Sequence, residues 1–296
     1  MDELYHSIIG GIAIIGIIIG ILTPLALIVL GMPGNNASLV PLKDLDNLFP
    51  GLDISINGIS TGSLHVSSTH YKLLSTKNIS IPNTGTINIG VHIDNGYVVL
   101  EKNPVNDIVV KIYVKKYVSG GYNVDYDVSS NTVNIDLNNR YVKLAVGIPE
   151  NLAINNFSLD MLNGVITIHV SNVRKFLSMK VDNGVVNADI QDLTVTTTSL
   201  RMNNGVVNLN LGYNALPGSS SLNIILNNGV LRATVKVPGT TKLEIIPSIT
   251  NSVSSITLNG KIIRQFYQDP GFSNSTSKLY CKITIMNGYA NVEFTR

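Results

Sequence analysis

The stretches Lys180-Val-Asp-Asn-Gly-Val-Val-Asn-Ala-Asp-Ile190 and Arg201-Met-Asn-Asn-Gly-Val-Val-Asn-Leu-Asn-Leu211 decide the fold of this chain. In each of them apolar residues occupy alternate positions after the Asn-Gly pair, as at Val186, Ala188 and Ile190. A period of two residues is typical of a β-strand with one buried face. The two stretches therefore predict strands that bury aliphatic side chains on one side.

The Asn-Gly pair recurs along the chain at a near-constant interval. From Asn163 the next three copies follow after 20, 21 and 24 residues, which indicates a repeat architecture. The eight pairs begin at Asn57, Asn95, Asn163, Asn183, Asn204, Asn228, Asn259 and Asn287. The four central ones are the predicted structural turns: Asn163 and Gly164, Asn183 and Gly184, Asn204 and Gly205, and Asn228 and Gly229.

Two geometries suit an Asn-Gly pair, because a sharp reversal needs a positive φ angle that Gly accepts freely and Asn better than most residues. In the first, each pair is a two-residue hairpin turn, so that Val181 faces Val186 within one unit. In the second, each pair is the corner of a solenoid coil, and equivalent residues stack on the coils above and below. Stacking also explains why neighbouring units share a Val after Gly and keep a similar length.

The repeat units resemble a known family. The units between Val146 and Ile263, with Val146-Gly-Ile-Pro149 before them and Val237-Pro238 after them, are similar to the adhesin-like family that carries domain of unknown function 4097. The resemblance implies a right-handed β-solenoid, called a toast-rack, on a membrane-anchored envelope protein. The chain departs from the family pattern by having Val or Tyr where many members have Asp after Gly.

The predicted fold class is all-β, a right-handed β-solenoid-like repeat domain that follows one N-terminal transmembrane helix. An antiparallel hairpin array or a sandwich is the alternative. The predicted organisation is a tail at 1–6, a transmembrane helix at 7–31, a linker at 32–50, an N-terminal β section at 51–145, the Asn-Gly repeat solenoid at 146–263 and a C-terminal β cap at 264–296.

The N-terminal segment is long and apolar enough to span a bilayer. No charged residue or His occurs from Ser7 to Leu42, and a helix from Ile8 to Leu30 reaches about 35 Å, against a hydrocarbon core of about 30 Å. Asp2 and Glu3 precede the segment instead of the basic residues of a cleaved signal peptide. A retained anchor is the prediction, with cleavage as its rival.

The side of the membrane is predicted from sequons, since the charges near the span are balanced. Asn-x-Ser/Thr sequons, which mark possible glycosylation in an exported chain, begin at Asn36, Asn78, Asn156 and Asn274. The expected location is the cell membrane, with residues 32–296 extracellular. The expected partners are the lipid bilayer, through residues 7–31, and glycans or cell-surface proteins.

Composition excludes several function classes. The chain of 296 residues has 21 Lys plus Arg against 19 Asp plus Glu and no basic run, so no nucleic acid is expected as a partner. The lone Cys281 excludes an internal disulfide and a multi-cysteine zinc site, and its alternating context predicts a small core residue. The histidines are scattered, and no metal or cofactor is predicted.

Carboxylates are the remaining enzymatic option, because sugar-cleaving β-solenoids use clustered Asp or Glu. Asp94, Asp160, Asp182 and Asp189 could align on successive coils, although Asn203 takes the turn position of Asp182 in the next unit. The predicted function is that of a non-catalytic, adhesin-like or envelope-structural surface protein. The alternatives are an envelope-stress or signalling accessory domain with a membrane partner and, third, a carbohydrate-active enzyme.

Overall fold

The computed structural model describes residues 54–56, 64–66, 71–81, 85–115, 121–127, 129–138, 142–216 and 218–296. The predicted tail at 1–6, helix at 7–31, linker at 32–50 and sequon at Asn36 lie outside these residues, as does Asn57. Within the described ranges, the structure contains no helix with the length and apolar character to cross a membrane. The predicted anchor therefore stays a prediction.

The described chain is almost entirely β-structure. Its strands are β1 (Ile54–Ile56), β2 (Leu64–Val66), β3 (Tyr71–Ile79), β4 (Thr86–Asn103), β5 (Ile108–Lys115), β6 (Gly121–Asp127), β7 (Thr132–Asn138), β8 (Val142–Pro149), β9 (Ala153–Ser171), β10 (Val173–Leu193), β11 (Thr197–Tyr213), β12 (Ser219–Lys236), β13 (Lys242–Ile249), β14 (Ser252–Leu258), β15 (Lys261–Ile262), β16 (Tyr267–Gln268) and β17 (Lys278–Thr295), with a short 3-10 helix η2 (Phe272–Asn274) before β17.

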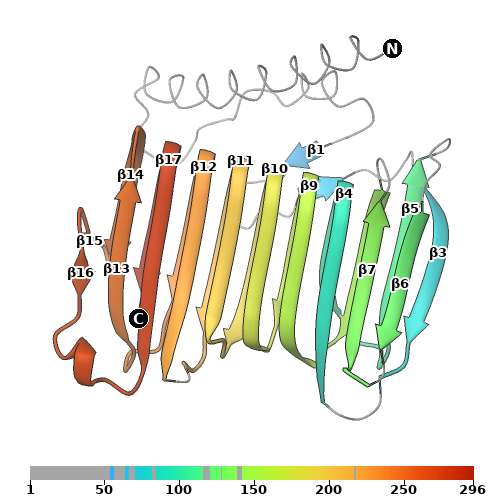
Figure 1. Ribbon diagram of the computed structural model, residues 1–296, viewed down its shortest axis with the longest axis horizontal. Helices are drawn as coiled ribbons and strands as arrows, with labels where there is room; N and C mark the ends of the chain where they lie inside the picture. Colours follow the sequence, from blue (N-terminus) through green and yellow to red (C-terminus); the bar gives the residue numbers. More distant parts are fainter. Residues whose placement is uncertain are drawn as a thin grey trace, which may run out of the picture.

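Six long strands form the body of the molecule. They lie side by side in the order β4, β9, β10, β11, β12 and β17, and every neighbouring pair is parallel (Figure 1). The Asn-Gly pairs are in register throughout, so that Asn183 is level with Asn163 on one side and Asn204 on the other. The prediction that equivalent residues stack on neighbouring units is confirmed.

Each long strand turns a corner at its Asn-Gly pair. In β10, Leu177, Met179 and Val181 are buried before the pair, and Val186 and Ile190 are buried after it. Val181 and Val186 are separated by five positions, so an uninterrupted flat strand would point them to opposite faces. The corner reverses this parity, and both halves of the strand send their aliphatic side chains into one core.

Glycine is required at the corner because the backbones approach closely there. The six corner glycines have φ between 137° and 158°, a region that L side chains rarely adopt. A Cβ atom on Gly184 would lie 1.9 Å from the carbonyl oxygen of Gly164, and one on Gly205 would lie 1.9 Å from that of Gly184. The column continues in the same way through Gly229 and Gly288.

The asparagine before each corner glycine extends a hydrogen-bonded ladder along the stack. In each rung Nδ2 of one Asn donates to Oδ1 of the Asn on the preceding strand, at 2.7 to 2.9 Å. The ladder, called the corner ladder below, contains Asn95, Asn163, Asn183, Asn204, Asn228 and Asn287. Such ladders of identical amides satisfy donors and acceptors along a parallel in-register stack.

At both ends of the column two shorter strands replace one long strand. At one end β7 pairs with the first half of β4, and β8 pairs with its second half. At the other end β13 and β14 cover the two halves of β17 in the same way. The last strand in sequence, β17, thus lies between β12 and the earlier pair β13 and β14 (Figure 1). The column includes Asn95 and Asn287, which lie outside the predicted repeat segment 146–263.

One Asn-Gly pair is a hairpin turn and not a corner. Asn259 and Gly260 have φ of 47° and 77° and join the antiparallel strands β14 and β15. Positive φ at both central residues is the mark of a type I′ hairpin turn. For the six corner pairs the hairpin alternative is wrong, because the strands that carry them pair in parallel with neighbouring units.

The corner column makes a specific prediction for Gly205→Ala. The new Cβ would collide with the Gly184 carbonyl oxygen at a strained φ, and we expect a loss of about 3 kcal/mol or more in the free energy of unfolding. Urea denaturation measures this loss. Gly239→Ala is the control, because a Cβ at Gly239 meets nothing within 4 Å and should change stability by less than about 0.5 kcal/mol. Equal stability of the two variants would contradict the role of the column.

Candidate functional site

An open groove of about 600 Å³ lies on the outer face of the sheet, over strands β4, β8 and β5. The groove is hollow over β8 because the outward-facing positions after Lys143 carry the small residues Ala145 and Gly147. Larger side chains on the flanking strands form its walls. The inward positions of the same strand, such as Leu144 and Val146, are buried in the core, so the groove rests on a rigid support.

A row of two tyrosines and a lysine closes one end of this groove. Tyr97 on β4 and Tyr113 on β5 both lie directly opposite Lys143 on β8, which is between them. The Lys143 ammonium is 5.8 Å from the centre of the Tyr97 ring and 5.4 Å from that of Tyr113. Both distances allow a cation–π attraction, which holds the ammonium at the end of the groove.

Electrostatics at the groove are set by three lysines and one carboxylate. Lys102, Lys111, Lys143 and Glu101 line it, which leaves a surplus of positive charge. The Lys102 ammonium donates to the carbonyls of Pro149, Glu150 and Leu152 at 3.2 to 3.3 Å.

Burial affects two of the groove residues. It lowers the pKa of Lys102 against the opposing attraction of Glu150 and Asp192. It also raises the pKa of the hydroxyl of Tyr97, a residue that is largely buried. Lys102 therefore has a structural role at the loop before β9, whereas Lys111 and Lys143 line the groove without such bonds to backbone carbonyls among the described residues.

The four predicted turns lie together in the corner column, on β9 to β12. The described sequons are dispersed. Asn78 on β3 and Asn274 in η2 are exposed, and Asn156 is exposed on β9 while its Nδ2 donates to Asn88 Oδ1 at 2.7 Å. Whether any of them carries a glycan stays a prediction.

None of the four aspartates considered for catalysis lines the groove, and each has a polar partner of its own. Asp160 pairs with Lys180 at 3.3 Å, and Asp94 lies 3.7 Å from His92. Asp182 accepts from Asn203 on the next strand, which in turn accepts from Asn227.

Asp189 likewise accepts from Asn210 and from Gln191, and it lies 3.1 Å from Nδ1 of the neighbouring His169. A carboxylate can only accept, so it fits at the acceptor end of an amide ladder. Asp182 and Asp189 occupy that end, which gives both a structural role.

Cys281 is 1% exposed on β17, and burial raises the pKa of its thiol, which disfavours the thiolate needed by a nucleophile. The prediction of a core cysteine is confirmed.

The groove over β4, β8 and β5 was not predicted. The sequence feature that indicates it is the alternation Lys143, Ala145, Gly147, in which small residues face outward on a strand between two strands that carry tyrosines.

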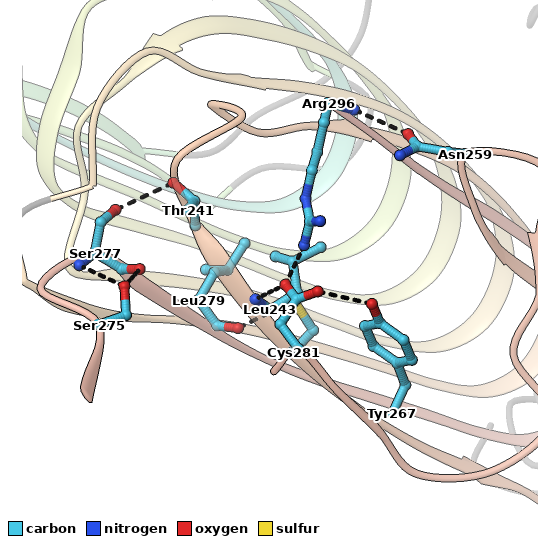
Figure 2. A network of polar contacts seen from close by, with 10 residues as sticks. Thr241, Leu243, Asn259, Tyr267, Ser275, Ser277, Leu279, Cys281 and Arg296 are labelled. Carbon is cyan, nitrogen blue, oxygen red and sulfur yellow. Dashed lines mark hydrogen bonds and ion pairs between the residues drawn. The ribbon is translucent and has the colours of Figure 1, made fainter. Parts of the chain in front are cut away.

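A second polar cluster closes the other end of the molecule. The Asp269 carboxylate, 5% exposed, accepts from the Leu243 backbone N–H at 2.7 Å, from the Tyr267 hydroxyl at 2.7 Å and from the Arg296 guanidinium. Figure 2 shows Leu243, Tyr267 and Arg296 converging on one point from different segments. Burial alone would raise the pKa of Asp269, but these donors outweigh it and hold the pKa below its ordinary value.

Fold and site together define an all-β protein of stacked parallel strands, with a basic, tyrosine-lined groove at one end and a buried carboxylate with three donors at the other. Neither a protein-family model nor a curated protein matches the chain.

Among solved structures, the chain is similar over 76% of its length to 99% of a "putative cell adhesion protein" from Clostridium sporogenes, at 13% identity and a TM-score of 0.46. It is similar over 75% of its length to 97% of a "putative adhesin" from Bacteroides fragilis, at 15% identity and a TM-score of 0.34. A "putative adhesin" from Parabacteroides merdae is similar at 12% identity, over 76% of this chain and 97% of that one, with a TM-score of 0.24. At such TM-scores the likeness carries no argument about what this chain does.

The Asp269 cluster predicts a pH-dependent stability of the end of the sheet. Asp269→Asn removes the charge of a buried carboxylate that accepts from three donors, and we expect a loss of about 2 kcal/mol at neutral pH. Because the folded pKa of Asp269 is depressed, this stability is present above the ordinary Asp pKa of about 3.9 and is lost as the pH falls through the lower folded pKa. Thermal denaturation across pH measures it.

The difference between wild type and Asp269→Asn should accordingly shrink on acidification. Asp125→Asn, at an exposed carboxylate on β6, is the control and should match wild type at neutral pH. A difference between wild type and Asp269→Asn that is the same at all pH values would show that the carboxylate charge has no part in the cluster.

Proposed function

We propose that this chain is an adhesin-like surface protein that binds glycans through the groove over β4, β8 and β5, without catalysis. The observation that carries the proposal is the placement of two ammonium groups and a partly exposed Tyr113 ring over a floor of small residues. Sugars bind to proteins through flat aromatic faces and polar groups, which this groove combines.

Charge favours an acidic glycan as the ligand. Lys143 and Lys111 face the groove, and no carboxylate lies within ion-pair distance of either among the residues that the structure describes. A sugar carboxylate near Lys143 would gain a charge-assisted hydrogen bond, and the ring that carries it would lie against Tyr113. Glu101, on the opposite wall, disfavours ligands with several close negative charges.

The proposal includes the winding and the location of the chain. Successive parallel strands need a crossover, and such crossovers are right-handed in about 98% of cases, which supports a right-handed β-solenoid. The charge-free segment at 7–31 supports a single-pass anchor that holds residues 32–296 outside the cell. A stack fixed by the corner ladder would then display the groove on a stiff support.

A binding assay tests the groove. Full-length protein in detergent is applied to a glycan array that holds matched acidic and neutral glycans, and the released reducing ends are measured in parallel. We expect binding to carboxylated glycans without hydrolysis. Lys143→Gln should weaken that binding about tenfold or more, because it removes a charge-assisted contact. Added salt should weaken it too.

Two further variants separate the groove from general charge. Ala145→Leu keeps every charge but fills the floor, and it should also weaken binding. Lys261→Gln removes an exposed charge on β15, at the far end of the sheet, and should bind like wild type. Unchanged binding by both groove variants, or a preference for neutral glycans, would contradict the proposed site.

The proposed topology has its own test. Protease added to intact cells that express the chain should degrade residues 32–296 and leave the segment at 7–31 in the membrane fraction. A marker enzyme of the cytosol is the control for cell integrity. Complete protection of the β domain in intact cells, with digestion after lysis, would place it on the inner side.

A further inference from the structure

The structure separates seven described Asn-Gly pairs into two chemical environments. Six lie in the corner column, and the seventh, Asn259-Gly260, forms the β14–β15 hairpin turn. An Asn-Gly sequence is open to a particular reaction, since the backbone nitrogen of Gly can attack the Asn side-chain carbon without hindrance from a Cβ. The question is which of the seven pairs has the freedom to react.

Both partners in this reaction are fixed in the corner column. The Asn183 side chain donates to Asn163 Oδ1 at 2.9 Å and accepts from Asn204 Nδ2 at 2.7 Å. Gly184 is held between Gly164 and Gly205 in the strand register. Ring closure would have to break both side-chain hydrogen bonds and displace the backbone of a packed strand. These pairs can react only after local opening of the stack.

The hairpin pair is less constrained, and its backbone is held only through the Asn259 N–H, which donates to the Phe294 carbonyl at 2.9 Å, among the bonds of the described chain. Asn259 and Gly260 are exposed, and a Cβ on Gly260 would meet nothing within 4 Å. The flanking strands pair over only two residue pairs. In the described chain no hydrogen bond holds Asn259 Nδ2 or the Gly260 N–H, whereas Asn259 Oδ1 accepts from the Arg296 backbone N–H at 3.2 Å. That donor points at the oxygen on which negative charge develops during attack.

We infer that Asn259 is the deamidation site of the folded protein. The Gly260 nitrogen attacks Asn259 Cγ and loses its proton, a new C–N bond forms, and the bond from Cγ to Nδ2 breaks as ammonia leaves. Water then opens the cyclic imide at one of its two carbonyls and yields aspartate or isoaspartate. Water is the only co-reactant, and no electrons are transferred.

The product changes the end of the sheet. Isoaspartate inserts an additional carbon into the backbone of a two-residue turn, which the type I′ geometry does not accommodate. The hairpin would then lose the short pairing of β15 with β14 and leave more of the β14 edge unpaired. Unpaired edges invite association, so deamidation at this position enlarges the part of the β14 edge that another strand can join.

Peptide mapping by mass spectrometry tests the inference on the full-length folded protein in detergent, incubated at mildly alkaline pH. We expect the peptide with Asn259 to deamidate at least about tenfold faster than those with Asn183 and Asn204, the factor that corresponds to about 1.4 kcal/mol of local opening. In denaturant the three rates should converge, because all three sites share the Asn-Gly sequence.

Equal rates in the folded protein would overturn the inference. So would a rate difference that persists unchanged in denaturant, since sequence context and not structure would then be its cause. Asn259→Gln gives an independent readout: the early isoaspartate signal of the folded protein should disappear in this variant. Its persistence would assign the signal to another residue and exclude Asn259 as the site.

Discussion

The close contact of glycine backbones at the corner is the constraint on which the rest of the structure depends. At each level the carbonyl oxygen of one corner glycine occupies the space where a Cβ of the next would be. A slip of one residue between neighbouring strands would place a side chain there, so the contact fixes the register. Once the register is fixed, Asn183 must meet Asn163 and Asn204, and the aliphatic rows must align.

Much of this follows from particular residues of the sequence. The spacing of Asn163, Asn183 and Asn204 predicts stacked units, and their shared Val predicts the register. The burial parity also points to a corner, since a flat strand cannot bury both Val181 and Val186 on one face. An interior that takes both halves of a strand requires the chain to bend between them.

Other features depend on contacts that no local pattern contains. Asn259-Gly260 and Asn287-Gly288 are the same dipeptide, yet the first is a hairpin turn and the second is a corner. The difference lies in the neighbours: β17 has a long strand on one side and the two strands β13 and β14 on the other, whereas β15 has only β14. The groove also depends on neighbouring strands, because it exists only where β8 lies between β4 and β5.

The regular middle of the column restricts which side chains can occur there. A side chain that recurs at one level must be compatible with its own copies about 4.8 Å away, which favours amides and aliphatics and disfavours repeated charges. Asp182 and Asp189 obey this rule by terminating ladders as acceptors. The Tyr97, Tyr113 and Lys143 row, which breaks the repeat, becomes available where β8 replaces a long strand.

The position of β17 shows how the second end is closed. The units from β9 to β12 pair with neighbours close in sequence, whereas β17 pairs with β12 across the intervening β13 to β16. The edge of β12 therefore stays open until the last strand enters, and an open edge of this length favours association with other chains. Asp269 precedes β17 in the sequence and Arg296 follows it directly, and the contact between their side chains joins the chain before and after this strand. A buried carboxylate at this junction makes closure of the sheet sensitive to the charge of one group, because protonation weakens the attraction between Asp269, bound to Leu243 of β13, and Arg296 at the end of β17.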